Sequence, residues 1–374
     1  MEGQSKTTDV RGFPIQMLPF LPLELIAKHM AMEERLSLAL TSTKTEQFLM
    51  RCRFHEDSVQ TIFFCDQKNG QVADITIITD VGTMVVQCGV AHQDQEMGAG
   101  IIKKVVQVSK WCDKKLPTIH NAQTVYRRIC RLIPSIGMTV YLGRLGTADV
   151  EKVMVAEEFK NWMIACVNGD VDARGVGVVM DYASLEKRVI CSPAVRLPDD
   201  FTHEKAFHFK QSHYVNARWV RIEHLLSMRG VQEVTLMYTN LKVAEINTFI
   251  HHCMESEEAV CGRITIGLAG VFLELGDLLN GMVVVQHPWI TTFYARSETH
   301  DSSRIATIEV TMHGLRLEFT PEDKFLGSVV ELLRLVKSKN NIEKEIMTMD
   351  PNDVATRMRL LRELEELRVQ LADN

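Results

Sequence analysis

The sequence predicts an α/β chain (α+β overall) in which a small helical unit precedes a domain of repeating strands and helices, a closing β-hairpin and C-terminal helices. Three observations predict this order. Helix-spaced apolar residues lie between positions 13 and 53, alternating apolar pairs recur about every thirty residues in the central third, and proline-led helix starts follow near the C-terminus. With 374 residues, of which 46% are hydrophobic, the chain is long enough for two or three compact units.

Composition narrows the classes of function. The net charge of −6 gives no overall basic field for nucleic acid or an anionic membrane, and no run of ~20 apolar residues predicts a membrane span. Residues 1–12 are polar and lack the apolar stretch of a secretory signal, so we expect a disordered tail. The nine cysteines are scattered and never spaced C-x-x-C, which predicts buried thiols in a reducing compartment, cytoplasmic and/or nuclear.

Residues 13–53 have the pattern of three short helices. Pro22 fits the first turn of a helix, and Thr41 or Ser42 can cap the third one. The apolar positions follow helical spacing in the first two stretches: Leu23, Ile26 and Met30, then Leu36, Leu38, Ala39 and Leu40. So small a unit buries little apolar surface by itself, so it either packs on the rest of the chain or presents an apolar face to a partner.

The same stretch resembles a known module. Leu18-Pro19, the helical positions, Leu36-Ser-Leu-Ala-Leu40 and Ser42-Thr-Lys44 look like an F-box, the helical module that docks substrate receptors onto the Skp adaptor of SCF-type cullin–RING ubiquitin ligases. Many F-boxes carry a Trp near the end, where this chain has Thr45 to Phe48. The resemblance implies binding of the Skp adaptor, and through it of cullin, by seven residues: Leu18, Pro19, Leu23, Ile26, Met30, Leu36 and Leu40.

Residues 54–118 are expected to link this unit to the next domain through short strands. The runs "VQTIFFC", "ADITIITD" and "GTMVVQCG" have strand character between positions 59 and 90. The polar loop at 92–100 contains Gly98 and Gly100, but no complete phosphate-binding motif follows.

A strand–helix repeat is expected within residues 119–320. Alternating apolar pairs begin 31, 27 and 30 residues apart: Val176/Val178, Phe207/Phe209, Val234/Leu236 and Ile264/Ile266. Helix-like segments, "ARWVRIEHLLSM" and "VAEINTFIHHCMES", lie between the last three pairs. This period is just outside the range of leucine-rich repeats, so we interpret the region as a leucine-rich-repeat-like array in which each unit buries its face on its neighbours.

A second resemblance covers the same region. The segment "ARWVRIEHLLSMRGVQEVTLMYTNLKVAEINTFIHHCMES" resembles the core of the nematode F-box-associated type 2 domain, and "SSRIATIEVTMHGLRLEF" resembles that family's closing hairpin. The matching positions are Trp219, Leu225, Leu226, Val234, Leu236, Asn240-Leu241, Ile246-Asn247 and Phe249. The family usually has a Trp soon after this Phe, where His252-Cys253 stand here.

Together the two resemblances imply a non-enzymatic substrate receptor of an SCF-type ligase. Strand geometry adds an expected substrate face, because side chains between the buried apolar pairs point outward. The expected substrate-binding residues are Lys205, His208, Lys210 and Met237. The alternative is a Skp-bound or free scaffold that assembles partners without a role in ubiquitylation.

The C-terminal part, 321–374, is expected to be helical. Alternation before and after His313-Gly314 predicts the closing hairpin, and Thr320-Pro321 and Asp350-Pro351 are strong helix starts. The last helix carries a short seam of Leu360, Leu364, Leu367 and Leu371. This seam either folds back onto the domain or supports self-association.

No pattern in the chain indicates catalysis. No G-x-S-x-G or Cys–His signature frames a nucleophile. His251 and His252 are adjacent, and adjacent helical residues point about 100° apart and rarely share one ion. We therefore expect no cofactor and no metal, and we expect the four tryptophans, Trp111, Trp162, Trp219 and Trp289, to be structural.

Overall fold

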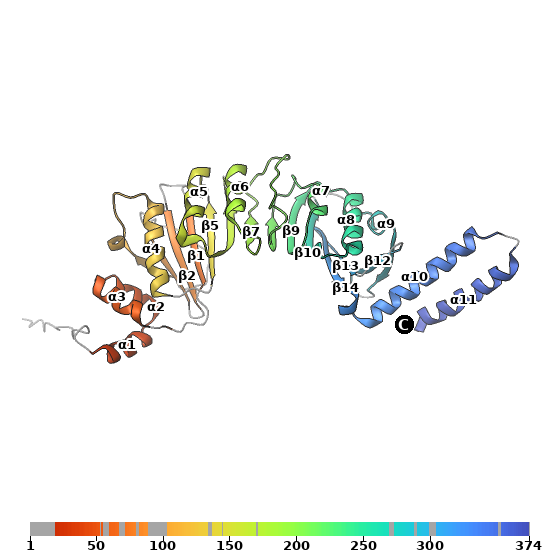
Figure 1. Ribbon diagram of the computed structural model, residues 1–374, viewed down its shortest axis with the longest axis horizontal. Coiled ribbons are helices and arrows are strands. Elements are labelled where there is room, and N and C mark those ends of the chain that lie inside the picture. The colour runs from red at the N-terminus through yellow and green to blue at the C-terminus, as the bar shows by residue number, and fades with distance from the viewer. Residues whose placement is uncertain are drawn as a thin grey trace, which may run out of the picture. The chain divides into compact units, whose positions relative to one another are not determined.

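A computed structural model shows two compact units (Figure 1). The first comprises Met1–Gly143 and Val155–Met163, and the second comprises Arg144–Met154 and Ile164–Asn374. The structure describes residues 19–52, 54, 60–66, 72–79, 82–88, 103–133, 137–143, 145–169, 171–268, 273–287, 290–298, 304–350 and 353–373. The tail at 1–12 and the loop at 92–100 lie outside these residues.

The first unit begins with the three short helices that the sequence predicts. They are α1 (Phe20–His29), α2 (Met32–Ala39) and α3 (Thr43–Arg51). Ser42 caps α3, since its hydroxyl accepts a hydrogen bond from the backbone N–H of Thr45 at 3.1 Å. Ala27, Leu36 and Leu49 are buried, one from each helix.

Five strands and a long helix complete the first unit. They are β1 (Gln60–Asp66), β2 (Val72–Thr79), β3 (Gly82–Gln87), β4 (Lys103–Gln107), α4 (Thr118–Leu132) and β5 (Gly137–Gly143). The strand order is β5-β1-β2-β3-β4, with β1 and β5 parallel and β1, β2 and β3 antiparallel. The three predicted strands are confirmed. Residues 119–143, expected in the repeat domain, form most of α4 and β5 and belong to the first unit.

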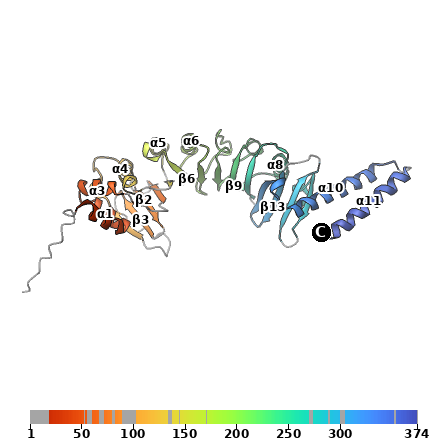
Figure 2. The same cartoon turned by 60° about the horizontal axis from the view of Figure 1, so that its bottom comes forward.

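The second unit contains a parallel strand–helix array. Its elements are β6 (Trp162–Asn168, of which Trp162 and Met163 belong to the first unit), α6 (Ala173–Tyr182), β7 (Arg188–Cys191), β8 (Gln211–Tyr214), α7 (Ile222–Leu226), β9 (Val231–Thr239), α8 (Val243–Glu255) and β10 (Cys261–Leu268). Strands adjacent in the chain are adjacent and parallel in the sheet. The three helices lie on one face of these strands (Figure 1, Figure 2). The paired positions are Ile164, Arg188, Gln211, Glu233 and Arg263.

Two of the four apolar pairs that predicted this array are not in strands. Val176 and Val178 lie in α6, and Phe207 and Phe209 lie in a turn before β8. Apolar residues two positions apart also occur on the buried side of a helix or in a packed turn, so spacing by itself does not distinguish these cases. The parallel strands in this part of the chain start at other residues, with β7 at Arg188 and β8 at Gln211.

The connection from β7 to β8, residues 192–210, contains no helix, and an aromatic cluster forms between this connection and residues on and after β8. The Trp219 ring lies 5.0 Å from that of Phe201, 5.5 Å from Phe207 and 5.3 Å from Tyr214. The Tyr214 hydroxyl donates to the carbonyl oxygen of Ala206 at 2.7 Å. This cluster takes the place of a connecting helix.

Antiparallel strands close the second unit. They are β11 (Met282–Gln286), β12 (Thr292–Ser297), β13 (Arg304–Thr311) and β14 (Gly314–Pro321), and α9 (Leu275–Leu278) precedes them. Their order is β10-β14-β13-β12-β11. The predicted hairpin is confirmed, but its connection is Met312–His313, one residue earlier than expected. Gly314 has φ 148°, and a Cβ there would collide with the carbonyl oxygen of Ile266 on β10.

Two long helices follow, α10 (Gly327–Thr348) and α11 (Val354–Asp373). The first starts later than Thr320-Pro321 predicts, because Glu322–Lys324 form a 3-10 turn. The N-terminal part of α10 packs on the strands through Val283, Ile305, Val330 and Leu333. The leucine seam of α11 folds back onto α10, where Leu360 and Leu364 pack with Ile342.

We predict that Leu236→Ala destabilises the second unit by about 2–5 kcal/mol, the usual range for truncating a fully buried leucine. Leu236 is 0% exposed and pairs with Tyr214 and Ile266 on the neighbouring strands. The measurement is the free energy of unfolding in urea, with hydrogen exchange of the β9 amides. Thr235→Ala, on the other side of the same strand, is the matched control and should change that free energy by less than about 0.5 kcal/mol. Equal effects of the two changes would contradict the core assignment.

Candidate functional site

The helical unit exposes a group of large apolar side chains. Phe20, Leu21, Leu25 and Ile26 on α1 have exposed fractions of 49%, 70%, 60% and 39%. Isolated exposed apolar residues are common, but several on one short helix are typical of an interaction surface. We call these four residues the α1 surface.

The seven residues implied by the F-box resemblance are not equally accessible. Pro19 and Ile26 are exposed, and Leu23, Met30 and Leu40 are half-buried. Leu36 is only 1% exposed, so its side chain belongs to the interior of the unit and not to its surface. Leu18 lies outside the described residues. Helical spacing identifies the apolar positions, but it does not tell which of them the unit buries itself.

Two members of the α1 surface, Phe20 and Leu21, are outside the helical pattern that the sequence indicates, and Leu25 lies beside that pattern without being among the residues implied to bind the adaptor. Their signal is the apolar run that flanks Pro22, which has more apolar residues than one helical face needs. Next to this surface, a shallow groove lies between α1 and α2. Its lining residues are Ile26, Met30, Glu33, Glu34, Ser37, Leu38 and Thr41.

An ion pair fastens the helical unit to the rest of the first unit. Glu46 on α3 is 4% exposed and accepts two hydrogen bonds from the guanidinium of Arg128 on α4, one from Nε at 2.7 Å and one from Nη2. The same guanidinium lies over the ring of Trp111, with Cζ 4.3 Å from its centroid. A bidentate pair with a stacked aromatic ring fixes the orientation of α3. The α1 surface is therefore held on an anchored unit.

The second candidate surface is the side of the parallel strands that faces away from α6, α7 and α8. Val234, Leu236, Ile264 and Ile266 point toward the helices, so their neighbours in sequence point the other way. One row of paired residues crosses this open face: Arg188, Gln211, Glu233, Arg263 and Glu318. Arg263 and Glu318 form an ion pair at 3.2 Å. The open face is thus polar and carries both signs of charge.

A second row of the open face includes His213, Thr235 and Thr265, and Met237 follows two residues later on β9. The face ends under α10. Ile305 contacts α10 and points to the same side as Thr307, which pairs with Glu318. Met237 is therefore the one residue of the four expected substrate-binding residues that lies on this face.

The expectation for Lys205, His208 and Lys210 is wrong in its geometry, because these residues lie in and next to the turn that precedes β8. The Lys205 ammonium donates to the carbonyl oxygen of Asp181 at 2.7 Å. The Lys210 ammonium pairs with Glu186 at 3.3 Å. The structure does not bring these residues together with Met237 on one strand face.

His213 on the open face has a shifted pKa. Burial lowers the pKa of His213 from its ordinary value of 6.5, and the nearby positive charge of Arg188 lowers this pKa further, against the opposing effect of Glu233. Burial likewise lowers the pKa of His224 and of His252. Neutral imidazole is thus favoured at all three positions.

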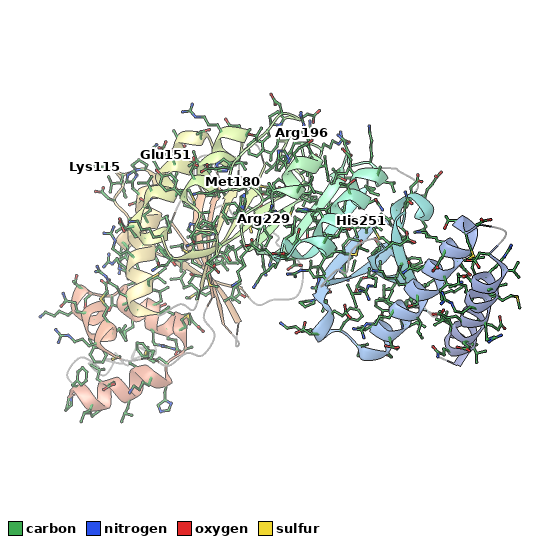
Figure 3. All side chains as sticks on the ribbon, turned by 45° about the vertical axis from the view of Figure 1, so that its right-hand side comes forward. Lys115, Glu151, Met180, Arg196, Arg229 and His251 are labelled. Carbon is green, nitrogen blue, oxygen red and sulfur yellow. The ribbon has the colours of Figure 1, made fainter. Side chains whose placement is uncertain are left out.

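Elsewhere, Cys191, Cys261 and His251 are buried or hydrogen-bonded within the fold. Burial raises the pKa of Cys191 and of Cys261 to about 12, which keeps both as thiols. His251, labelled in Figure 3, contacts Glu255 at 3.3 Å and the carbonyl oxygen of Asn280 at 3.0 Å. Within the described ranges, no group of histidine, cysteine and acidic residues could hold a metal, and no helix is long and apolar enough to cross a membrane.

Comparison with known proteins gives no match: no protein-family model, no curated protein and no solved structure matches the chain. The α1 surface and the open face are therefore the features from which a function is inferred.

We predict that Glu46→Gln lowers the free energy of local opening of α3 by about 2–3 kcal/mol. Hydrogen bonds to charged groups contribute on this scale, and Arg128 would lose its counter-charge. Hydrogen exchange of the α3 amides measures the change. Glu157→Gln is the matched control, because Glu157 pairs with Lys160 at the surface, where an ion pair contributes about 0–1 kcal/mol. An unchanged exchange rate in α3 would refute the anchoring role.

We predict that the stability of the second unit falls as the pH drops below 6.5. The unfolded chain then takes up protons that His213 resists in the folded state, so protonation favours unfolding. Replacing His213 with Gln should reduce this fall, as measured by the midpoint of urea unfolding at pH 7.5 and pH 5.5. His29→Gln, at an exposed position of α1, is the control. An unchanged pH dependence in His213→Gln would count against the effect.

Proposed function

We propose that the chain is a substrate receptor of an SCF-type cullin–RING ubiquitin ligase, with an F-box at residues 13–53. The observation that carries the proposal is the α1 surface, because it combines the F-box-like sequence with exposed apolar side chains on an anchored three-helix unit. An apolar face of this kind gains free energy when a partner covers it. The proposed partner is the Skp adaptor.

In this proposal the adaptor contacts the α1 surface (Phe20, Leu21, Leu25 and Ile26), and it also contacts Pro19, Leu23, Met30 and Leu40. Leu36 acts indirectly, since it packs inside the helical unit and supports the surface. The exposed apolar side chains would form the interface core, and the polar residues of the adjoining groove would form its rim.

The substrate would bind the open face of the second unit, around Met237, Thr235 and Thr265. This face is broad and polar, so recognition would depend on hydrogen bonds and matched charges more than on a deep pocket. Catalysis in this proposal is by proximity: the receptor raises the effective concentration of a substrate lysine near the ubiquitin-conjugating enzyme. The receptor itself performs no bond chemistry.

We predict that Leu25→Asp and Ile26→Asp each weaken binding of the Skp adaptor by at least about tenfold, because an unpaired charge is costly in an apolar interface core. Titration calorimetry with purified adaptor measures the dissociation constant. Met312→Asp is the matched control, since Met312 is 93% exposed at the turn between β13 and β14 in the second unit. It should bind the adaptor as the unchanged chain does.

The same reagents separate the receptor from the scaffold alternative. With adaptor, cullin and RING subunit present, a receptor should co-purify with the cullin. Unchanged adaptor binding in both Asp variants would overturn the F-box assignment. Binding of the adaptor without recovery of the cullin would favour the scaffold.

A further inference from the structure

In the described part of the open face, Arg188 on β7 has no adjacent charge of opposite sign. In the row of paired residues that crosses this face, Glu233 and Arg263 are neighbours of opposite sign. The register neighbours of Arg188 are Ile164 on β6 and Gln211 on β8, and neither carries a charge. Among the residues that the structure describes, no carboxylate forms an ion pair with Arg188.

The titratable groups closest to the Arg188 guanidinium are neutral. Burial raises the pKa of the Cys166 thiol and lowers that of the His213 imidazole, and the positive charge of Arg188 lowers both. Cys166 on β6 and His213 on β8 pair with the same residue of β7, Ile190, so the guanidinium acts on both neighbouring strands. A neutral thiol and a neutral imidazole leave the charge of Arg188 uncompensated.

The position of the Arg188 side chain favours an anionic ligand. Arg188 is half-buried, and its Nε is enclosed without a hydrogen-bond partner in the described chain. A cation that is partly removed from water without a counter-charge is unfavourable, and a carboxylate that docks beside it would offset this cost. The guanidinium Nη groups form a fork that matches the two oxygens of a carboxylate. Gln211, next in register, adds an amide donor.

We propose that Arg188 and Gln211 bind the side-chain carboxylate of an acidic residue in a protein substrate, with His213 beside them. This proposal rests on the proposed function, because it takes the open face as the substrate surface. A carboxylate fits better than a phosphoryl group, since its single negative charge matches one guanidinium. Glu233 lies on the same row two strands from Arg188, roughly 10 Å across the sheet, and disfavours a ligand with a second negative charge.

The first experiment selects a displayed library of random peptides on the purified full chain. The unchanged chain should enrich Asp or Glu at one position of the selected peptides. Arg188→Glu should enrich Lys or Arg at that position, because the charge that selects the residue is reversed. Arg316→Glu is the matched control, since Arg316 is a cation of the same face that already pairs with Glu309 at 3.2 Å. This control should keep the acidic preference.

The second experiment measures the dissociation constant of one selected peptide by titration calorimetry. Arg188→Gln should raise this constant by at least about tenfold, and so should replacement of the acidic peptide residue by glutamine. Both changes together should stay within about threefold of either one alone, because both remove the same contact. The change in the peptide leaves the protein unaltered, so it tests the contact even if Arg188→Gln folds poorly.

A peptide with phosphoserine in place of the acidic residue distinguishes the two kinds of oxyanion. Binding more than about tenfold tighter than that of the acidic peptide would assign the site to a phosphorylated substrate and overturn the proposal. Three other results would also overturn it: no acidic position in the selected peptides, the same acidic preference in Arg188→Glu, or independent effects of the two glutamine changes.

Adaptor binding, measured on the same samples, separates this site from the ligase proposal. An adaptor that binds the unchanged chain, together with peptides that show no acidic preference, would refute the acidic-residue site and leave the ligase function in place. Acidic peptides that bind through Arg188, in a chain that does not bind the adaptor, would support the site and refute the F-box assignment.

Discussion

In the second unit, each parallel strand from β6 to β10 must bury its helix-facing side chains, and this requirement determines much of the architecture around it. Where α6 and α8 are present, they cover those side chains. Between β7 and β8 no helix is available, so the Trp219 cluster covers them instead. Because strand side chains alternate, the same requirement leaves a polar open face on the other side. Packing on one side thus creates the candidate binding face on the other.

The first unit meets a different requirement: it must hold a short helical segment and still leave apolar side chains uncovered. The Glu46–Arg128 pair fulfils it, because two directed hydrogen bonds and the contact with Trp111 fix α3 without using α1. A buried ion pair of this kind adds orientation more than stability. It leaves the apolar residues of α1 available to another molecule.

The sequence predicts the elements with clear local signals. The three N-terminal helices, strands β1 to β3, helix α8 and the closing hairpin lie where spacing and turn residues place them. The predictions fail where a pattern fits two structures. Val176 and Val178 are apolar because α6 is buried, and Phe207 and Phe209 are apolar because the turn packs on Trp219. Neither tertiary reason is visible in local spacing.

The candidate sites were predictable only in part for the same reason. Helical spacing found Ile26 but also selected Leu36, and only packing shows that Leu36 is inside. Met237 lies on a strand, as its alternating neighbours predict. Lys205, His208 and Lys210 do not, because the strand that their pattern predicts starts only at Gln211. Exposure of Leu21 and Leu25 depends on which neighbours cover the helix, and local spacing does not contain that information.

The two compact units are interleaved along the chain, and this affects how the protein can be divided. Residues Arg144–Met154 belong to the second unit, but the next segment, Val155–Met163, belongs to the first unit again. Phe159, from that segment, is fully buried, and its ring centroid lies 5.4 Å from that of Tyr126 on α4, with the two ring planes tilted by 40°. A fragment that stops at Gly143 therefore leaves Tyr126 without its aromatic neighbour and exposes part of the first core. Expression of either half requires fragments that overlap through residue 163, because no single cut separates two complete folding units.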